Sequence, residues 1–231
     1  MRPTIKPAGD SALLVSFGEV IDEKINGRIH SIAREIEKVG FEWLVEAVPA
    51  YSSLLVIYDP LKASYTAVEA SIKPLLNVET GTFDGRLVKV PVVYGGQYGP
   101  DIDFVAEHSG LSVDDVIEIH SRPTYLVYFL GFLPGFAYLG GMDERIAVPR
   151  LEKPRLKVPA GSVGIAGKQT GIYPLESPGG WRLIGRTPLR LFNPLKEQPT
   201  LLQPGDRVKF VPIDGEEFVE IYRTEWGEGS D

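Results

Sequence analysis

The chain has 231 residues, of which 43% are hydrophobic and 24% charged, and it carries a net charge of −7. This composition is typical of a soluble globular protein, and the length allows one large domain or two small ones. The absence of cysteine excludes disulfides, thiolate metal sites and a cysteine nucleophile, while the acidic net charge argues against non-specific binding of nucleic acid.

Residues 1–82 are predicted to form a small α+β domain. Apolar runs indicate strands at 12–17, 43–48 and 54–58. Apolar residues spaced by three or four indicate helices over 21–39 and 65–76. The order β-α-β-β-α predicts a sandwich of the split-βαβ, ferredoxin-like kind. A further strand at 87–93 either completes this sheet or opens the next domain.

Residues 83–231 are predicted to form a mainly-β domain, with the polar segment 77–86 as the boundary. Two short helices come first: Asp101 is expected to cap one of them, and Ser112 forms a capping box with Asp115 for the other. From residue 125 onward the pattern indicates at least eight strands in about 105 residues, which predicts a closed barrel because closure removes exposed strand edges. These strands include 189–192 and 217–223, and a frayed tail is expected after them.

The segment 131–188 is rich in glycine and proline, with 11 and 7 of them. Aromatic and β-branched residues between them indicate tight turns joining short strands, not a linker. Residues 145–190 contain nine lysines or arginines and two acids, a local charge of +7 in an acidic chain. Two interpretations stay open: an anion-binding site, or a barrel face whose cations pair with acids elsewhere.

Several searches for motifs fail. The run GSVGIAGK resembles a P-loop, but five residues separate its outer glycines and Gln169 follows the lysine where Ser or Thr should bind magnesium. The three histidines lack metal-ligand spacing, so no metal site is predicted, and no G-x-S-x-G elbow is present. The N-terminus lacks the apolar stretch of a signal peptide and no run of about 18 apolar residues exists, which favours a cytoplasmic protein without membrane association.

A row of polar residues on the expected barrel strands is the candidate binding site for a substrate or anion. Arginine can bind a carboxylate or phosphate, and glutamine and tyrosine can hydrogen-bond an amide. For each residue, a structural role in a turn or strand end is the competing interpretation. His120 is either a packed histidine or a base that titrates near neutrality. The row consists of Arg155, Ser162, Gln169, Thr170, Tyr173, Ser177 and Arg186.

The aromatic loop GFLPGFAYLGG is a candidate partner interface through Phe132, Phe136 and Tyr138. A tight turn cannot bury all of these rings, and exposed aromatic clusters mark interfaces or ligand mouths. The alternative is that they plug one end of the barrel.

This loop and the following PRLEKPRLKVPAGSVGIAGKQTGIYPLESPGGWRLIGRTP resemble the family that contains the B subunit of 5-oxoprolinase, also called allophanate hydrolase subunit 1. The resemblance extends to GDSALLVSFG, VPAYSSLLVIYDP and LLQPGDRVKF, so it covers nearly the whole chain. The same family includes a bacterial sporulation-kinase inhibitor and part of the carboxyltransferase region of urea carboxylase.

The resemblance implies an α+β domain followed by a cyclophilin-like β-barrel. It also implies ATP-dependent cleavage of the lactam 5-oxo-L-proline to L-glutamate together with subunits C and A. The chain is expected to be inactive alone, because its sequence shows no P-loop, no metal-ligand cluster and no nucleophile–base pair. ATP, accompanied by Mg²⁺, would occupy a site shared with those partners. A regulator that inhibits a histidine kinase and a carboxyltransferase-type half-enzyme acting in trans are the alternatives, and a homo-oligomer is left open.

Overall fold

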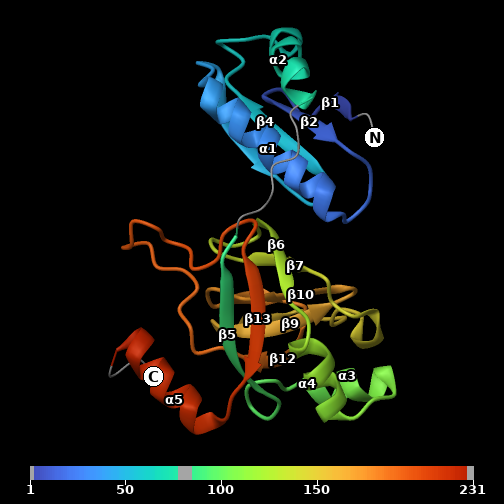
Figure 1. The fold of residues 1–231 in the computed structure, drawn as a ribbon, viewed down its shortest axis with the longest axis vertical. Helices are drawn as coiled ribbons and strands as arrows, with labels where there is room; N and C mark the ends of the chain where they lie inside the picture. Colours follow the sequence, from blue (N-terminus) through green and yellow to red (C-terminus); the bar gives the residue numbers. More distant parts are fainter. Residues whose placement is uncertain (1–2, 78–84, 228–231) are drawn as a thin grey trace. The chain divides into compact units, whose positions relative to one another are not determined.

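The computed structural model describes residues 3–77 and 85–227 (Figure 1). The chain divides into two compact units, Met1–Phe83 and Asp84–Asp231, each with its own hydrophobic core. Residues 78–84, which hold most of the predicted boundary, lie outside the described residues.

The first unit contains, in its described part, a four-stranded antiparallel sheet in the order β1-β2-β4-β3. The strand β1, with a single strongly apolar residue (Ile5), was missed by the sequence prediction. It takes the outer position beside β2, whereas the strand at 87–93 belongs to the second unit. The split-βαβ classification therefore stays a prediction. The strands are β1 (Thr4–Pro7), β2 (Ala12–Ser16), β3 (Leu44–Pro49) and β4 (Ser53–Tyr58).

The helices of this unit begin and end at the signals that the sequence carries. Asp22 accepts a hydrogen bond from the backbone of Ile25 at the start of the first helix, and Gly40 ends it in the left-handed conformation. The apolar stripe of this helix packs on the sheet core. The helices are α1 (Glu23–Val39), α2 (Tyr65–Ile72) and the 3₁₀ turn η1 (Lys73–Asn77).

In the second unit, seven strands of the described residues form a closed barrel in the order β10-β7-β6-β13-β5-β12-β9 (Figure 1). The predicted closed barrel is confirmed. It is mixed, because β5 and β13 run parallel while the other pairs are antiparallel. The strands are β5 (Leu87–Tyr94), β6 (Tyr125–Leu130), β7 (Ala137–Gly140), β9 (Ser162–Ala166), β10 (Gln169–Ile172), β12 (Arg182–Arg186) and β13 (Arg207–Pro212).

Elements outside the barrel complete this unit. A separate two-stranded sheet pairs β8 with β11, and helix residues such as Val105 and Val116 pack into the barrel core. The capping box of Ser112 and Asp115 is confirmed at the start of the second helix. These elements are β8 (Arg155–Val158), β11 (Ser177–Gly179), α3 (Ile102–Ser109), α4 (Val113–Ser121), η2 (Glu144–Ile146) and α5 (Gly215–Trp226).

Two predicted strands are wrong. Residues 217–223 lie in α5, because Asp214 caps two backbone N–H groups and the rings of Phe218, Tyr222 and Trp226 stack at helical spacing. Residues 224–226, expected to fray, also belong to this helix. Residues 189–192 form only an isolated bridge, at Phe192, within the long segment that projects from the barrel between β12 and β13 (Figure 1).

Candidate functional site

An aromatic pocket of about 300 Å³ in the second unit is the candidate site. Its walls come from the β6–β7 loop, from β7, from the residues before β8, from the end of β10 and from the turn at β11. The lining residues are Phe132, Phe136, Tyr138, Arg150, Leu151, Pro154, Tyr173, Pro178, Gly179, Gly180 and Trp181.

Phe136 is the centre of the pocket wall and is 1% exposed. Its ring lies 5.4 Å from that of Tyr173 and 5.5 Å from that of Trp181, at 83° and 90°. It also meets the rings of Tyr138 and Phe132 at 61° and 83°. Such edge-to-face contacts each add about 0.5–1.5 kcal/mol beyond the area buried. The sequence therefore builds a rigid aromatic wall from one loop and two strand ends.

Two glycines allow these rings to approach the backbone. A Cβ at Gly179 would lie 2.5 Å from the Tyr173 hydroxyl oxygen. A Cβ at Gly171 would lie 3.1 Å from both the Phe136 and Trp181 rings. A side chain at Gly179 would displace the Tyr173 ring, and one at Gly171 would be tight against two rings, so both glycines allow the close packing of the wall.

Arg150 supplies the positive charge of the pocket. Burial raises the pKa of Tyr173 and of Tyr138, and in both cases the charge of Arg150 opposes that rise in pKa. The Trp181 backbone hydrogen-bonds the Tyr173 hydroxyl and also lowers its pKa. Both tyrosines therefore stay neutral near pH 7, leaving a cation beside polarisable rings. Among the described residues, no carboxylate lies within ion-pair distance of Arg150.

Most of the predicted polar row lies away from this pocket, and of that row only Tyr173 lines it. Arg155 donates to the Asp101 carboxylate at 2.8 Å. Arg186 donates to the Ala160 carbonyl at 2.8 Å and lies over the Phe218 and Tyr222 rings of α5. Ser162 is buried beside Arg186 in the β9–β12 pair. The strands therefore distribute these side chains over several faces.

The other members of the row have local positions. The Ser177 hydroxyl is 7% exposed and donates to the Pro178 carbonyl at 3.2 Å. Gln169 is half-buried at the hairpin between β9 and β10. For Ser177 the structural interpretation fits the observed bond.

His120 and Thr170 meet inside the barrel. His120 is 0% exposed, its Nδ1 lies 2.8 Å from the Tyr94 hydroxyl and its Nε2 lies 2.8 Å from Thr170 Oγ1. Because Thr170 donates to the Gly164 carbonyl at 3.1 Å, we assign the ring proton to Nε2 and the accepted bond to Nδ1. Burial lowers the pKa of His120 to about 3. His120 is therefore a packed histidine that stays neutral near pH 7, so the expectation that it titrates near neutrality is not met.

The basic segment is largely neutralised by ion pairs. Arg145 pairs with Asp143, Lys157 with Glu176, Lys168 with Glu144, and Arg155 and Arg182 with Asp101. Within the described residues, Arg150, Lys153, Arg186 and Arg190 remain without an acid in ion-pair distance. The interpretation of a barrel face with paired cations is therefore correct for five of the nine.

Asp101 occupies the N-cap position of α3, as the sequence predicts, but its side chain does not cap the helix. Its carboxylate makes no capping bond and accepts instead from the Leu183 backbone at 2.7 Å and from Arg155. The buried carboxylate therefore ties α3 to β12 and β8.

The aromatic loop divides between the two alternatives that the sequence left open. Phe136 is buried and packs under the pocket, so its assignment to an exposed partner interface is wrong. Tyr138 is half-buried and stacks on Phe129 at 4.4 Å. Phe132 is 62% exposed and has a φ of 63°, a left-handed conformation that costs a non-glycine residue about 1–2 kcal/mol. An exposed ring on a residue with a strained backbone, at the mouth of a pocket, is typical of a binding role.

Sequence reasoning missed Arg150 and Trp181 as pocket residues. Arg150 was counted only in the charge of its segment, and Trp181 only as a core residue. The pair Gly179–Gly180 beside Trp181 was the available signal, since adjacent glycines allow close approach to a ring or ligand.

Within the described residues, no group of three or more His, Asp or Glu side chains could hold a metal ion. A search of the same residues finds no helix with the length and apolarity needed to cross a membrane.

The fold and pocket define a two-unit protein whose mixed barrel unit carries an aromatic pocket. The family model "Carboxyltransferase domain, subdomain C and D" matches residues 3–202, and the chain belongs to this family. It is 46% identical over 97% of its length to the 5-oxoprolinase B subunit of Bacillus subtilis, covering 98% of that protein.

Solved structures agree with this placement. A conserved uncharacterized protein from Pyrococcus horikoshii is 71% identical, with a TM-score of 0.57 over 93% of this chain and 100% of that one. The K. lactis urea amidolyase, 24% identical, has a TM-score of 0.82 over 96% of this chain and 15% of its own, which shows the shared fold.

Proposed function

We propose that this chain is the B subunit of an ATP-dependent 5-oxoprolinase that acts with subunits A and C. The observation that carries the proposal is the pocket, which combines aromatic walls with Arg150. 5-Oxoproline is a small five-membered lactam that bears a carboxylate. Its ring suits apolar walls and its carboxylate suits a guanidinium, and the relatives named as B subunits of 5-oxoprolinase support the same reaction.

The pocket residues bind and orient the substrate in this proposal. Arg150 would bind the carboxylate, and the Phe136, Tyr173 and Trp181 rings would hold the lactam and exclude water from it. The described residues that line the pocket include no nucleophile–base pair, so in this proposal they position the substrate and the partners complete the reaction.

ATP would supply the energy of the reaction by activating the lactam oxygen, which makes a poor electrophile reactive. In the part of the chain that the structure describes, the pocket lining contains a single cation and no carboxylate, so it does not fit a nucleotide with Mg²⁺. A shared nucleotide site and its Mg²⁺ stay proposals. The cytoplasmic location expected from the sequence also stays a prediction.

Phe132 is the best candidate for a contact with a partner subunit. It is exposed and strained at the pocket mouth, where a partner would close the site over bound substrate. The assignment replaces Phe136 as the residue through which the loop reaches its partner.

The test is reconstitution. The purified chain, with subunits A and C, is expected to release glutamate from 5-oxoproline only when ATP and all three proteins are present. Glutamate release by A and C alone at the same rate would reject the proposal. ATP-dependent turnover by this chain alone would reject the division of labour.

A further inference from the structure

A second, basic groove of about 320 Å³ lies on the barrel unit, away from the aromatic pocket. It is bounded by the start of β5, by the segment that follows β12 and by the end of α5. Its polar and charged lining residues are Arg86, Lys89, Arg190, Asn193, Lys196, Gln198, Thr200 and Glu225.

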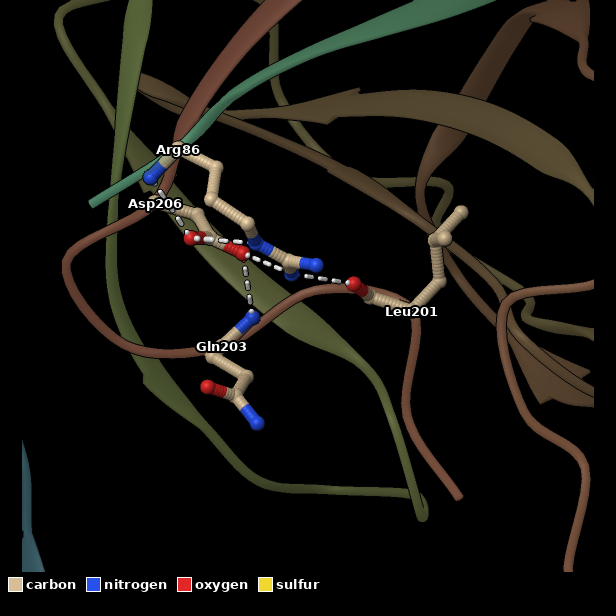
Figure 2. Close-up of polar contacts among 4 residues, drawn as sticks. All are labelled: Arg86, Leu201, Gln203 and Asp206. Atoms are coloured by element: carbon tan, nitrogen blue, oxygen red, sulfur yellow. Dashed lines mark hydrogen bonds and ion pairs between the residues drawn. The ribbon is translucent and has the colours of Figure 1, made fainter. Parts of the chain in front are cut away.

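Arg86 is held in a fixed orientation in this groove (Figure 2). Its guanidinium donates to the Asp206 carboxylate at 2.7 Å and to the Leu201 carbonyl at 2.9 Å. The same carboxylate accepts from the backbone of Arg86 at 3.1 Å and of Gln203 at 3.0 Å. Asp206 is 3% exposed while the Arg86 side chain is 57% exposed, so the buried acid orients an arginine that faces solvent.

The other three cations have no acid within ion-pair distance among the described residues. Arg190 is placed by its Nε donating to the Phe192 carbonyl at 3.4 Å and by the Trp226 ring, whose centroid is 5.2 Å away. Lys89 and Lys196 are exposed. Glu225 is the opposing acid on the rim, so the four cations, Asp206 and Glu225 together leave a charge of +2 in a chain of −7.

One wall of the groove is an ordered loop. The Asn193 backbone donates to the Pro199 carbonyl at 2.7 Å, and the Leu201 backbone donates to the Leu191 carbonyl at 2.9 Å. The Asn193 side chain accepts from the Leu195 backbone at 3.1 Å. These hydrogen bonds close the loop on itself. The loop therefore places two side chains that can hydrogen-bond, Gln198 and Thr200, beside the cations of the groove.

We propose that this groove binds the phosphate groups of a polyphosphate ligand, either a nucleoside triphosphate or an inorganic polyphosphate. An oriented arginine, exposed lysines and neutral donors together suit phosphate oxygens. A groove of this volume holds a compact anion, whereas an extended acidic peptide would need a longer cationic track. The proposal is independent of the proposed function, because it concerns binding by this chain alone.

The experiment is an NMR titration of the full-length chain at low ionic strength with sodium tripolyphosphate, and in parallel with ATP. Backbone amides at 86–89 and at the non-proline positions of 193–201 are expected to shift. The dissociation constant is expected to rise at least tenfold in a Lys89→Ala, Lys196→Ala variant. Within the described residues, neither side chain makes a hydrogen bond or an ion pair, so the fold should be kept. The control is Lys24→Ala, Lys38→Ala, which removes the same charge from exposed positions of α1 and should leave the affinity within twofold.

Tighter binding of ATP than of tripolyphosphate would identify a nucleotide as the ligand, and equal binding would identify the polyphosphate alone. The proposal is overturned by an absence of shifts in the groove, by an equal loss of affinity in the control variant, or by a hexaglutamate peptide that binds more tightly than tripolyphosphate. Since catalysis is not read out, failure here leaves the glutamate-release assay of the complex unaffected.

Discussion

The Asp101 carboxylate accepts a 2.8 Å hydrogen bond from the Arg155 guanidinium, which joins the start of α3 to β8. Arg182 lies at 3.9 Å from the same carboxylate and stacks over Phe104 at 3.6 Å. One buried acid therefore balances two arginines that are 29% and 17% exposed. Arg155 holds β8 in place in this arrangement and does not line the pocket.

Replacing Asp101 with alanine should lower the free energy of unfolding of the barrel unit by about 2–4 kcal/mol, because two partly buried guanidinium groups and the Leu183 N–H lose their acceptor. The loss of stability is measured by chemical denaturation of the full chain and, separately, by native-state hydrogen exchange of barrel amides. Asp103→Ala, at an exposed position on the first turn of α3, is the control and should cost less than about 1 kcal/mol. Equal costs would show that Asp101 is only a helix-end charge.

Phe136→Ala should destabilise the barrel unit by about 3–5 kcal/mol, since the ring is buried and packs against four other aromatic rings.

Phe132, on the same loop, offers the matched comparison. Phe132→Ala keeps the strained backbone, whereas Phe132→Gly relieves it, so the glycine variant should be more stable than the alanine variant by about 1 kcal/mol. Both variants should remain folded but lose association with the partner subunits, measured by co-purification. Partner binding equal to that of the unmodified chain would remove Phe132 from the interface.

The free energy of unfolding of the barrel unit should decrease as the pH is lowered, because His120 is held neutral in the folded state. Its folded pKa of about 3 lies below the ordinary 6.5, so the unfolded chain binds the proton first and stability present above pH 6.5 is lost as the pH falls toward 3. Tyr94 and Tyr125, which face the ring, have raised pKa values and stay neutral. From pH 7.5 to 5.5 the contribution lost is about 1.4 kcal/mol.

The measurement is hydrogen exchange of β9 and β10 amides at the two pH values. The unmodified chain and His108→Gln, changed at an exposed histidine, should share the acid sensitivity, whereas His120→Gln should lose about 1.4 kcal/mol of it whatever its absolute stability. An unchanged pH dependence in His120→Gln would mean that the imidazole charges in the folded barrel.

Local sequence signals were sufficient to predict much of the fold. Gly40 and the Ser112 capping box end and begin helices as expected, and the alternation of short apolar runs with Gly and Pro correctly predicted the closed barrel. Residues 217–223 misled because their apolar positions fit a strand as well as a helix, and only the Asp214 cap and the stacking of rings four residues apart decide between them.

The site was harder to predict because it depends on which face each strand turns inward. Thr170 and Tyr173 lie three positions apart, yet one enters the barrel core beside His120 and the other enters the pocket. A count of charges could not separate Arg155, which a buried acid neutralises, from Arg150, which lines the pocket. Strand alternation places Thr170 and Tyr173 on opposite faces, but which face points into the barrel, and which arginine meets Asp101, depend on register and long-range pairing.

Arg150→Ala should weaken the binding of 5-oxoproline by about 10- to 100-fold, the loss of one charged hydrogen-bonding pair of about 1.5–3 kcal/mol. In the reconstituted complex this should raise KM with little change in kcat, because the guanidinium would bind the carboxylate equally in the bound substrate and in the transition state of lactam cleavage. The affinity of Arg150→Lys for 5-oxoproline should lie between that of the unmodified chain and that of Arg150→Ala, since lysine keeps the charge but not the planar fork.

The discriminating ligand is 2-pyrrolidinone, which keeps the lactam ring and lacks the carboxylate. The unmodified chain should prefer 5-oxoproline over it, and Arg150→Ala should lose that preference, whereas the control Lys153→Ala, outside the pocket lining, should retain it. A preference for 5-oxoproline that survives in Arg150→Ala would mean that another group binds the carboxylate, and would move the substrate out of this pocket.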